Sequence, residues 1–528
     1  MKKLLLLNPF NSGMSDYLKK EHNKESPSIK YGLLSIGTYV KYKSEGQVDV
    51  KIIDYMSNEF NGFLIENYEK HLEKTIKEFA PDYIGVSGMF NFLLESVSFL
   101  GKTCKKYSNA QVFAGGPCAM TYAKELLENE YFDAVSCFEG EIPILRLCMS
   151  DNTQEEFENG ISWQTKGKLK RNYLPRPEYI CDLDEIPTLD FSLLNNLSQY
   201  MGAGTISDRV ENKYVSLPIH TSRGCPFNCV FCASHFVHGK KMRMMSAERV
   251  IADVTEYVKK YNIDHLEICD DQFLIDQERA KKILKGLAPL NLEVTTESGV
   301  SIFAINEEIA VLMKRAGINT TSLALESGCE YTLRKIIDKP VELKNVKEAV
   351  ACLKRNGVKV HLLIVIGFPG ENKQLREESM DFLRNINVDW FSVLCATPIK
   401  GSRLHDICVE NNYIDEATIM RDGYHKSIIN TEDFTADEIT EEAYLMNLEL
   451  NFVNNYNLKS CNYETAFSYF SYVAQKFPFH AFAHYYLAKA MMGLKYSKEE
   501  IEKEEAKFKE IISKDEKWYG YAKYFNLI

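Results

Sequence analysis

The sequence predicts an α/β protein with three folded parts: a doubly wound parallel sheet, a central partial (β/α) barrel and an all-helical C-terminal tail. Apolar runs rich in leucine or β-branched residues alternate with helical patterns through residues 1–155, which indicates the parallel sheet. The alternation resumes after residue 213, and from residue 431 the pattern is helical throughout. We therefore expect domains at 1–155, 213–430 and 431–528, with residues 156–212 as a linker.

The first domain is expected to contain five strands, at residues 3–8, 48–54, 83–87, 111–114 and 134–137. Helices are expected between and after them, at 32–43, 62–79, 93–107, 119–128 and 142–148. Ligands of such sheets bind beyond the carboxyl ends of the strands, where glycines let the backbone approach closely. The candidate ligand-binding residues are therefore Asn8, Pro9, Ser87, Gly88, Gly115, Gly116, Glu139 and Gly140. A nucleotide is a poor candidate ligand, because no GxGxxG follows the first strand.

The central part repeats strand and helix in six units, which predicts a partial (β/α)6 barrel of the TIM type. Its strands are expected at 214–219, 265–269, 292–296, 320–325, 358–366 and 390–396. Its helices are expected at 247–261, 277–287, 307–316, 343–356 and 374–385. Polar residues at the carboxyl ends of barrel strands are the first candidates for a site.

The helical tail contains a segment, residues 463–493, that faintly resembles a tetratricopeptide helix pair. One pair or slightly more cannot form a solenoid, so we expect this tail to dock on the core. It would serve either to recognise a peptide or protein or as a helical lid.

Composition and charge argue against several classes of protein. The 528 residues are 45% hydrophobic and 26% charged, as in soluble globular proteins. A net charge of −11 argues against nucleic acid as a primary partner. The apolar run near Met1 stops at Asn8, far short of the roughly 20 residues of a membrane span. Fourteen cysteines without a secretion signal indicate a cytoplasmic location.

Three cysteines, Cys225, Cys229 and Cys232, share one tight loop rich in Gly, Pro and Asn directly after the first barrel strand. Their thiolates can bind one iron–sulfur cluster, which normally has four protein ligands. A fourth cysteine at suitable spacing is missing, so one iron would stay open. The alternatives are buried cysteines or a zinc site without its fourth ligand, although zinc sites mostly use CxxC pairs or Cys/His sets.

This CxxxCxxC motif, with Phe231 before its last cysteine, resembles the signature of the radical SAM enzymes. The resemblance implies a [4Fe-4S] cluster whose open iron binds S-adenosylmethionine (SAM), and a flavodoxin- or ferredoxin-type electron donor. It implies anaerobic chemistry through a 5′-deoxyadenosyl radical. Besides Phe231, it places the following residues around SAM: Asp270 or Asp271 at the methionine ammonium, Glu326 and Ser327 at the ribose, and Val365 and Gly367 at the adenine.

The first domain resembles the cobalamin-binding domain that precedes many radical SAM cores. The shared features are an early proline before the helix YGLLSIGTYV, the strand end AGGP and a final FEGE. No Asp-x-His-x-x-Gly occurs, so cobalamin would bind base-off and without a histidine ligand. The resemblance assigns the candidate residues at the strand ends to cobalamin: Asn8, Pro9, Ser87, Gly88, Gly115, Gly116, Glu139 and Gly140. The cobalamin tail would lie near Ser87, Gly88, Gly115 and Gly116. The alternative is a cofactor-free Rossmann-like domain used for packing or for docking a substrate.

These resemblances lead us to expect a cobalamin-dependent radical SAM enzyme that methylates an unactivated carbon of a small-molecule or peptide substrate. A radical SAM cyclase, epimerase or rearrangement enzyme without methyl transfer is an alternative. A binding protein that keeps the fold without turnover is another. The sequence does not identify catalytic residues for the substrate.

Overall fold

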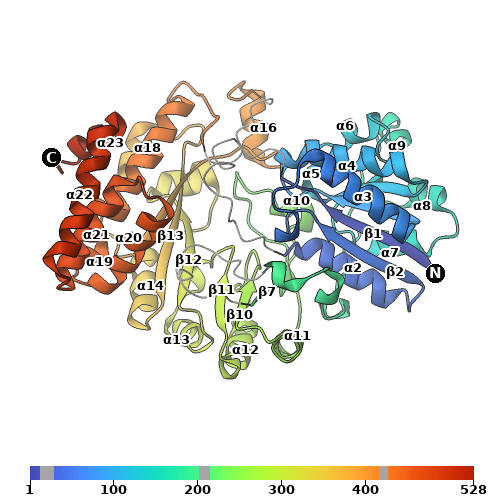
Figure 1. Ribbon diagram of the computed structural model, residues 1–528, viewed down its shortest axis with the longest axis horizontal. Coiled ribbons are helices and arrows are strands. Elements are labelled where there is room, and N and C mark those ends of the chain that lie inside the picture. Colours follow the sequence, from blue (N-terminus) through green and yellow to red (C-terminus); the bar gives the residue numbers. More distant parts are fainter. Residues whose placement is uncertain (12–28, 201–214, 416–425) are drawn as a thin grey trace. The chain divides into compact units, whose positions relative to one another are not determined.

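The computed structural model describes residues 1–11, 29–200, 215–415 and 426–528, which form two compact units (Figure 1). The first unit comprises residues 1–11, 29–200, 215–298 and 397–415, and the second comprises 299–396 and 426–528. Both contain parallel strands, and the second ends in a helical region. None of the helices in these described ranges is long and apolar enough to cross a membrane.

A six-stranded sheet organises the N-terminal part of the first unit. Its strands run in the order β2-β1-β3-β4-β5-β6, and all neighbours are parallel except β5 and β6. They are β1 Lys2–Asn8, β2 Val48–Asp54, β3 Tyr83–Ser87, β4 Gln111–Gly115, β5 Ala134–Ser136 and β6 Trp163–Gln164. The five expected strands are confirmed to within one residue at each end. The short β6 was not expected, because two residues carry no readable period.

Helices lie against both faces of this sheet. On one face, Leu5 and Leu7 of β1 pack in a buried cluster with Val97 of the helix at 94–107. On the other face, Ile52 of β2, the register partner of Leu6, packs against Gly37 of the helix at 31–43. The helices are α2 Tyr31–Lys43, α3 Ile65–Phe79, α4 Leu94–Tyr107, α5 Gly116–Thr121, α6 Ala123–Glu128, α7 Glu141–Met149, α8 Thr153–Asn159 and α9 Lys166–Lys170. The one helix expected at 119–128 is in fact two, and Pro117 sits in the first turn of the earlier one.

Residues of the predicted linker pack between α2 and a helix of the central part. Asp190 accepts hydrogen bonds from Lys41 of α2 at 2.7 Å and from Ser192. The guanidinium of Arg249 donates to the carbonyl oxygens of Asp184 and Ile186. Short 3-10 turns at Leu183–Glu185 and Phe191–Leu193 carry these residues. Residues 201–212 of the predicted linker lie outside the described residues.

A three-stranded parallel sheet in the order β11-β10-β7 completes the first unit. Its strands are β7 Ser216–Ile219, β10 His265–Ile268 and β11 Glu293–Thr296, and its helices are α11 Ala247–Tyr261 and α12 Gln277–Leu287. All five elements were expected, although Tyr214 of the first expected strand lies outside the described residues. A small hairpin of β8 Ser222–Arg223 and β9 Arg243–Met244 follows β7, and α10 Ser234–His238 lies between its strands. The unit also includes α16 Arg403–Glu410.

The second unit contains a parallel sheet in the order β12-β13-β14. Its strands are β12 Thr320–Glu326, β13 Lys359–Ile366 and β14 Trp390–Cys395, and its helices are α13 Glu307–Arg315, α14 Leu343–Arg355 and α15 Lys373–Leu383. These match the last three expected strands and the helices between them. A π-helical segment at Thr332–Ile337 was not expected.

The helical tail docks on this second sheet, as expected. It consists of α18 Ala436–Leu448, a π-helical turn at Glu449–Val453, α19 Tyr456–Lys459, α20 Tyr463–Lys476, α21 Ala481–Gly493, α22 Lys498–Lys514 and α23 Glu516–Tyr524. Asn447 and Asn451, one helical turn apart, pair with the backbone N–H and C=O groups of Val393 and Phe391 on β14. The two amides thereby satisfy an edge that would otherwise need another strand.

Candidate functional site

The three cysteines of the CxxxCxxC motif lie in the loop between β8 and β9. Gly224 opens the loop with φ +91°, and a Cβ there would lie 2.6 Å from the Lys241 carbonyl oxygen. Only glycine therefore fits this left-handed, closely packed position. Cys225, Cys229 and Cys232 are half-buried, as is Phe231.

The chemistry of these side chains fits an iron–sulfur cluster with one open iron. Soft thiolates are the preferred ligands of such clusters, and no described cysteine is used in a disulfide. Within the described ranges, no group of three or more His, Cys, Asp or Glu side chains is already arranged to hold a metal ion. The donor set thus fits the cluster.

The base of the cysteine loop is tied to the end of β5 by a buried ionic network. Arg223 and Arg243 are register partners in the β8–β9 pair. Both donate to the Oε2 atom of Glu139, Arg223 at 3.0 Å and Arg243 at 2.8 Å. His238 Nδ1 lies 2.7 Å from Glu139 Oε1, and Arg223 also donates to Glu141 at 2.7 Å. Glu139 was a candidate cobalamin residue, but its carboxylate is committed to these protein groups.

Burial and charge perturb the pKa values around this network. Burial alone would raise the pKa of Glu139, but hydrogen bonds from Arg243 and His238 and the charge of Arg223 hold it well below its usual range. Burial raises the pKa of Tyr31 to about 12. Burial lowers the pKa of His220, whose ring lies 4.2 Å from that of Tyr31, to about 3.

The two candidate acids after β10 have different roles in the structure. Asp270 is 1% exposed and accepts hydrogen bonds from the backbone N–H and hydroxyl of Thr221 and from the hydroxyl of Ser222. Burial raises its pKa, which these hydrogen bonds partly offset. Asp271 is half-buried and accepts from the hydroxyl of Ser234 in α10. Asp270 therefore anchors the start of the cysteine loop, and Asp271 is the acid with an accessible carboxylate.

At the ends of β1 and β2, the candidate residues face the protein rather than open space. Asn8 is 4% exposed and donates to Asp54 at 2.6 Å, and Tyr200 donates to the other oxygen of the same carboxylate at 2.8 Å. Pro9 is buried beside them. The polar groups at this edge are thus largely satisfied by one another.

The glycines at the ends of β3 and β4 differ in the room around them. Gly116 has φ +82°, and a Cβ there would lie 2.6 Å from the Gly88 carbonyl oxygen. A Cβ on Gly88 would lie 2.9 Å from Val97. Close packing within the chain thus explains both glycines. Among the residues that the structure describes, the atom nearest to a Cβ on Gly115 would be the Ser136 carbonyl oxygen at 3.8 Å, so this position has room for a ligand.

Two buried polar atoms at the same edge of the sheet have no hydrogen-bond partner among the described residues. They are Oγ of Ser136, at the end of β5, and Nδ2 of Asn91, in the turn after β3. Buried polar groups are normally hydrogen-bonded, so a ligand or water is expected to complete them. Met89, two residues before Asn91 in the chain, is 59% exposed. The sequence analysis missed all three residues, although a serine ending an apolar strand was a weak signal.

In the second unit, Glu326 ends β12 in a strained, buried conformation. Its φ of +72° is left-handed, which is rare for a non-glycine residue and is typical of functional positions. It is 6% exposed, and Lys339 pairs with its Oε1 atom at 2.6 Å. The neighbouring Ser327 and Gly328 pack against α15, where the Gly328 N–H donates to the Ser379 hydroxyl at 2.7 Å. Lys339 is a residue that the sequence analysis did not identify.

The turn after β13 is held by a buried acid that the sequence analysis did not identify. Glu371 is 0% exposed, and its Oε2 atom accepts from the Gly367 N–H at 2.7 Å. Its Oε1 atom has no hydrogen-bond partner in the described part of the chain. Burial raises the pKa of Glu371 to about 7. Gly367 faces the tail, because a Cβ there would lie 2.6 Å from Ile439 of α18. Val365, one of the candidate adenine contacts, is half-buried.

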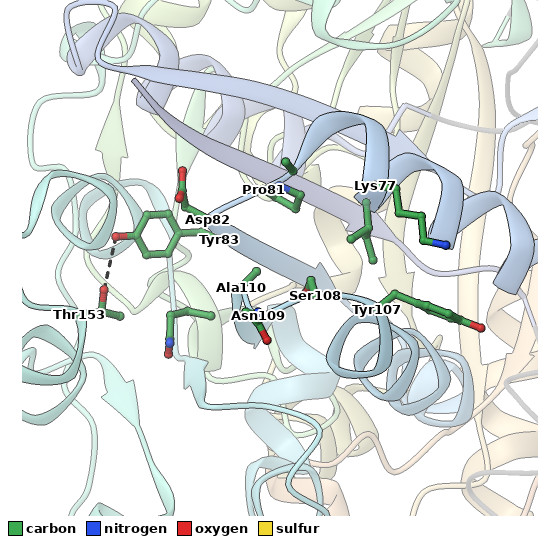
Figure 2. A pocket seen from close by; sticks show the side chains of 12 residues that line it. Lys77, Pro81, Asp82, Tyr83, Tyr107, Ser108, Asn109, Ala110 and Thr153 are labelled. Carbon is green, nitrogen blue, oxygen red and sulfur yellow. Dashed lines mark hydrogen bonds between the residues drawn. The ribbon is translucent and has the colours of Figure 1, made fainter.

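One cavity, of about 520 Å³, lies at the amino ends of β3 and β4 (Figure 2). Tyr83 and Gln111 begin these strands, and the Tyr83 hydroxyl points to Thr153 at 3.4 Å. Lys77 and Tyr107 line the opposite side. None of the predicted site residues lines this cavity, which lies at the other end of the strands.

Comparison with known sequences gives a family and several relatives. Residues 219–383 match the Radical SAM superfamily. Uncharacterized methyltransferase PH0819 of Pyrococcus horikoshii is 29% identical over 453 residues, which cover 84% of this chain and 92% of the relative. Cytidylyl-2-hydroxyethylphosphonate methyltransferase of Streptomyces wedmorensis is 28% identical over 448 residues, covering 76% and 83%. Anaerobic magnesium-protoporphyrin IX monomethyl ester cyclase of Rubrivivax gelatinosus is 24% identical over 365 residues, covering 67% and 62%.

Two solved structures share the fold. The radical S-adenosylmethionine methyltransferase TsrM of Kitasatospora setae, with cobalamin and a [4Fe-4S] cluster bound, has a TM-score of 0.62 at 13% identity. The match covers 98% of this chain and all of that one (100%). The cobalamin-dependent S-adenosylmethionine radical enzyme OxsB, with aqua-cobalamin and S-adenosylmethionine bound, has a TM-score of 0.60 at 14% identity, covering 100% and 81%. The cysteine motif lies within the family match, and the chain therefore contains a radical SAM domain.

Proposed function

We propose that this chain is a cobalamin-dependent radical SAM methyltransferase acting on an unactivated carbon. One observation carries the proposal: a radical SAM cysteine motif follows a parallel sheet in a chain that matches cobalamin-dependent radical SAM enzymes over nearly its whole length. Two sequence relatives named as methyltransferases, matched over 83% and 92% of their length, support the choice of reaction.

The chain's task in this reaction is to bind and orient. With both cofactors present, the cluster and SAM supply a 5′-deoxyadenosyl radical and cobalamin supplies the methyl group. Cys225, Cys229 and Cys232 would hold the cluster and leave one iron for SAM. Asp271 would accept a hydrogen bond from the methionine ammonium, because the carboxylate of Asp270 is buried and already bonded.

The remaining contacts to SAM are proposed on the second unit. Glu326 would accept from the ribose hydroxyls, oriented by its left-handed backbone and by Lys339. Ser327 would support this strand end, and Val365 and Gly367 would flank the adenine. Phe231 would pack beside the cluster. The proposal includes a partial (β/α)6 barrel formed by the strands β7, β10 and β11 together with β12, β13 and β14.

Cobalamin is proposed to bind at the carboxyl edge of the N-terminal sheet, in a Rossmann-like domain of residues 1–155. Gly115 has room for a ligand, and the partnerless Ser136 and Asn91 atoms offer it hydrogen bonds. Ser87 ends β3 at the same edge, and Met89 follows it two residues later. We propose base-off binding without a histidine ligand, because the sequence has no Asp-x-His-x-x-Gly.

The rest of the proposal concerns context. Residues 156–212 would be a linker, 213–430 the radical SAM core and 431–528 a tetratricopeptide-like helical domain. We propose a cytoplasmic enzyme that takes electrons from a flavodoxin- or ferredoxin-type protein and acts on a small molecule or peptide.

A second candidate function is a radical cyclisation or rearrangement without methyl transfer. It is favoured by the relative named as a cyclase and by OxsB, which is described as a radical enzyme rather than as a methyltransferase. The fold alone is compatible with either reaction.

Anaerobic purification with cobalamin supplied, followed by metal analysis and the visible spectrum, tests the proposal. We expect both iron and cobalt in the wild-type protein. Cys225→Ala should lose the iron, whereas Cys181→Ala, at an exposed position outside the motif, should keep it. Iron without cobalt would favour the second candidate, and a wild-type protein that retains no iron would contradict both.

A further inference from the structure

The segment that carries all three cysteines begins and ends at a single carboxylate. Arg223 precedes the loop, Arg243 follows it, and the two residues are register partners in the β8–β9 hairpin. Each donates a hydrogen bond to Glu139 Oε2, and Arg243 also donates to Glu139 Oε1 at 2.5 Å. One side chain from the end of β5 therefore joins the two ends of residues 224–242.

Glu139 also reaches inside the loop. His238, the last residue of α10, lies 2.7 Å from its Oε1 atom, and Arg243 donates to the His238 carbonyl oxygen at 3.2 Å. The Cζ atom of Arg243 lies 4.3 Å from the centroid of the Tyr179 ring, and the Tyr179 hydroxyl donates to the carbonyl oxygen of Val237 in α10. The contacts thus fix the two ends and the last part of the loop.

These groups are almost completely withdrawn from water. The side chains of Glu139, Arg223 and Arg243 are 3%, 5% and 5% exposed. Charged hydrogen bonds in such surroundings are strong and directional, and removing one partner leaves the other charge buried without compensation. A loop closed by such contacts samples far fewer conformations than the same residues without them.

We propose that Glu139 is a positioning residue for the cluster: by joining Arg223 and Arg243 it holds the loop of residues 224–242 in the conformation from which the three cysteines bind iron. The inference rests on the proposed function only in taking these cysteines as cluster ligands. It replaces the expectation that Glu139 contacts cobalamin directly.

Glu141 provides a matched control. It is a buried acid two residues away, 4% exposed, and it accepts hydrogen bonds from Arg223 and Ser35. No hydrogen bond or ion pair joins it to Arg243 or His238 among the contacts of the described residues. Glu141→Gln therefore removes a buried negative charge from the same network but leaves the two ends of the loop joined.

Amide hydrogen exchange of the metal-free protein tests the positioning role without the cluster. We expect Glu139→Gln to speed exchange within residues 224–242 by about tenfold or more, since it breaks two buried charge pairs. Glu141→Gln should change exchange in this loop much less, and Glu139→Asp should restore part of the protection. Equal exchange in the wild type and Glu139→Gln would overturn the proposal.

Cluster properties give the second measurement. After anaerobic reconstitution, Glu139→Gln should hold less iron than the wild type, and its reduced cluster should show an altered electron paramagnetic resonance spectrum when SAM is added. Loss of cobalt with a normal cluster spectrum would instead assign Glu139 to cobalamin and overturn the proposal. A wild type without iron would contradict the proposed function while leaving the exchange experiment decisive.

If Glu139→Gln does not fold, Arg243→Lys tests the same contact from the other side. Lysine keeps the charge but cannot donate to both carboxylate oxygens as a guanidinium does. Faster exchange confined to residues 224–242 would support the proposal, and unchanged exchange would overturn it.

Discussion

The buried acid Glu371 should make the second unit less stable as the pH rises. Its pKa in the folded protein is raised from 4.5 to about 7 by burial, so the folded state binds a proton that the unfolded state releases. The corresponding stabilisation is fully present below about pH 4.5 and is lost as the pH rises through about 7. Between pH 5 and pH 8 linkage predicts a loss of about 2.5 kcal/mol from this group.

Comparison of the wild type with Glu371→Gln isolates this contribution, because glutamine cannot ionise. Hydrogen exchange of the peptide containing Gly367, whose N–H donates to Glu371, reports openings that expose this turn. Wild-type protection relative to the variant should fall by roughly 70-fold between pH 5 and pH 8, which is the same 2.5 kcal/mol. Glu377→Gln, at an exposed position of α15, is the control and should leave the peptide unchanged. A wild-type-to-variant ratio that is constant with pH would refute the reasoning.

Further predictions concern the sheet edges and the candidate acids. Gly116→Ala should lower the free energy of unfolding by about 2 kcal/mol or more, because its Cβ would lie 2.6 Å from a backbone oxygen; thermal unfolding measures this. Gly115→Ala should fold normally but retain less cobalt, which metal analysis measures. Asp270→Ala should cost about 2–4 kcal/mol by leaving buried donors without an acceptor. Asp271→Ala should keep the stability of the wild type and bind SAM more weakly in calorimetric titration. Weaker SAM binding by Asp270→Ala together with a loss of stability in Asp271→Ala would contradict the assignment. Asn451→Leu should destabilise the second unit by about 2 kcal/mol in urea unfolding, since it strips two hydrogen bonds from the edge of β14, and wild-type stability would count against that role.

The sequence by itself determined the secondary structure and the cysteine motif. Strands such as β2 and β3 were found at their observed ends, because alternation and apolar runs are local properties of the chain. Cys225, Cys229 and Cys232 likewise lie within one short stretch of sequence, so their spacing predicts a shared iron–sulfur cluster without knowledge of the fold. The split of the expected helix at 119–128 into α5 and α6 escaped this reading, because helix boundaries depend on packing.

Only the tertiary structure decided which candidate carboxylates are available to a ligand and which glycines have space beside them for one. Adjacent acids in the sequence look equivalent, yet the Asp270 carboxylate is buried and accepts a hydrogen bond from Thr221, while Asp271 is half-buried. Glu139 looks like an accessible strand-end acid, but its partner Arg243 lies 104 positions away along the chain. The hydrogen bonds and burial that commit a charged group come from segments distant in sequence, so local pattern carries no record of them.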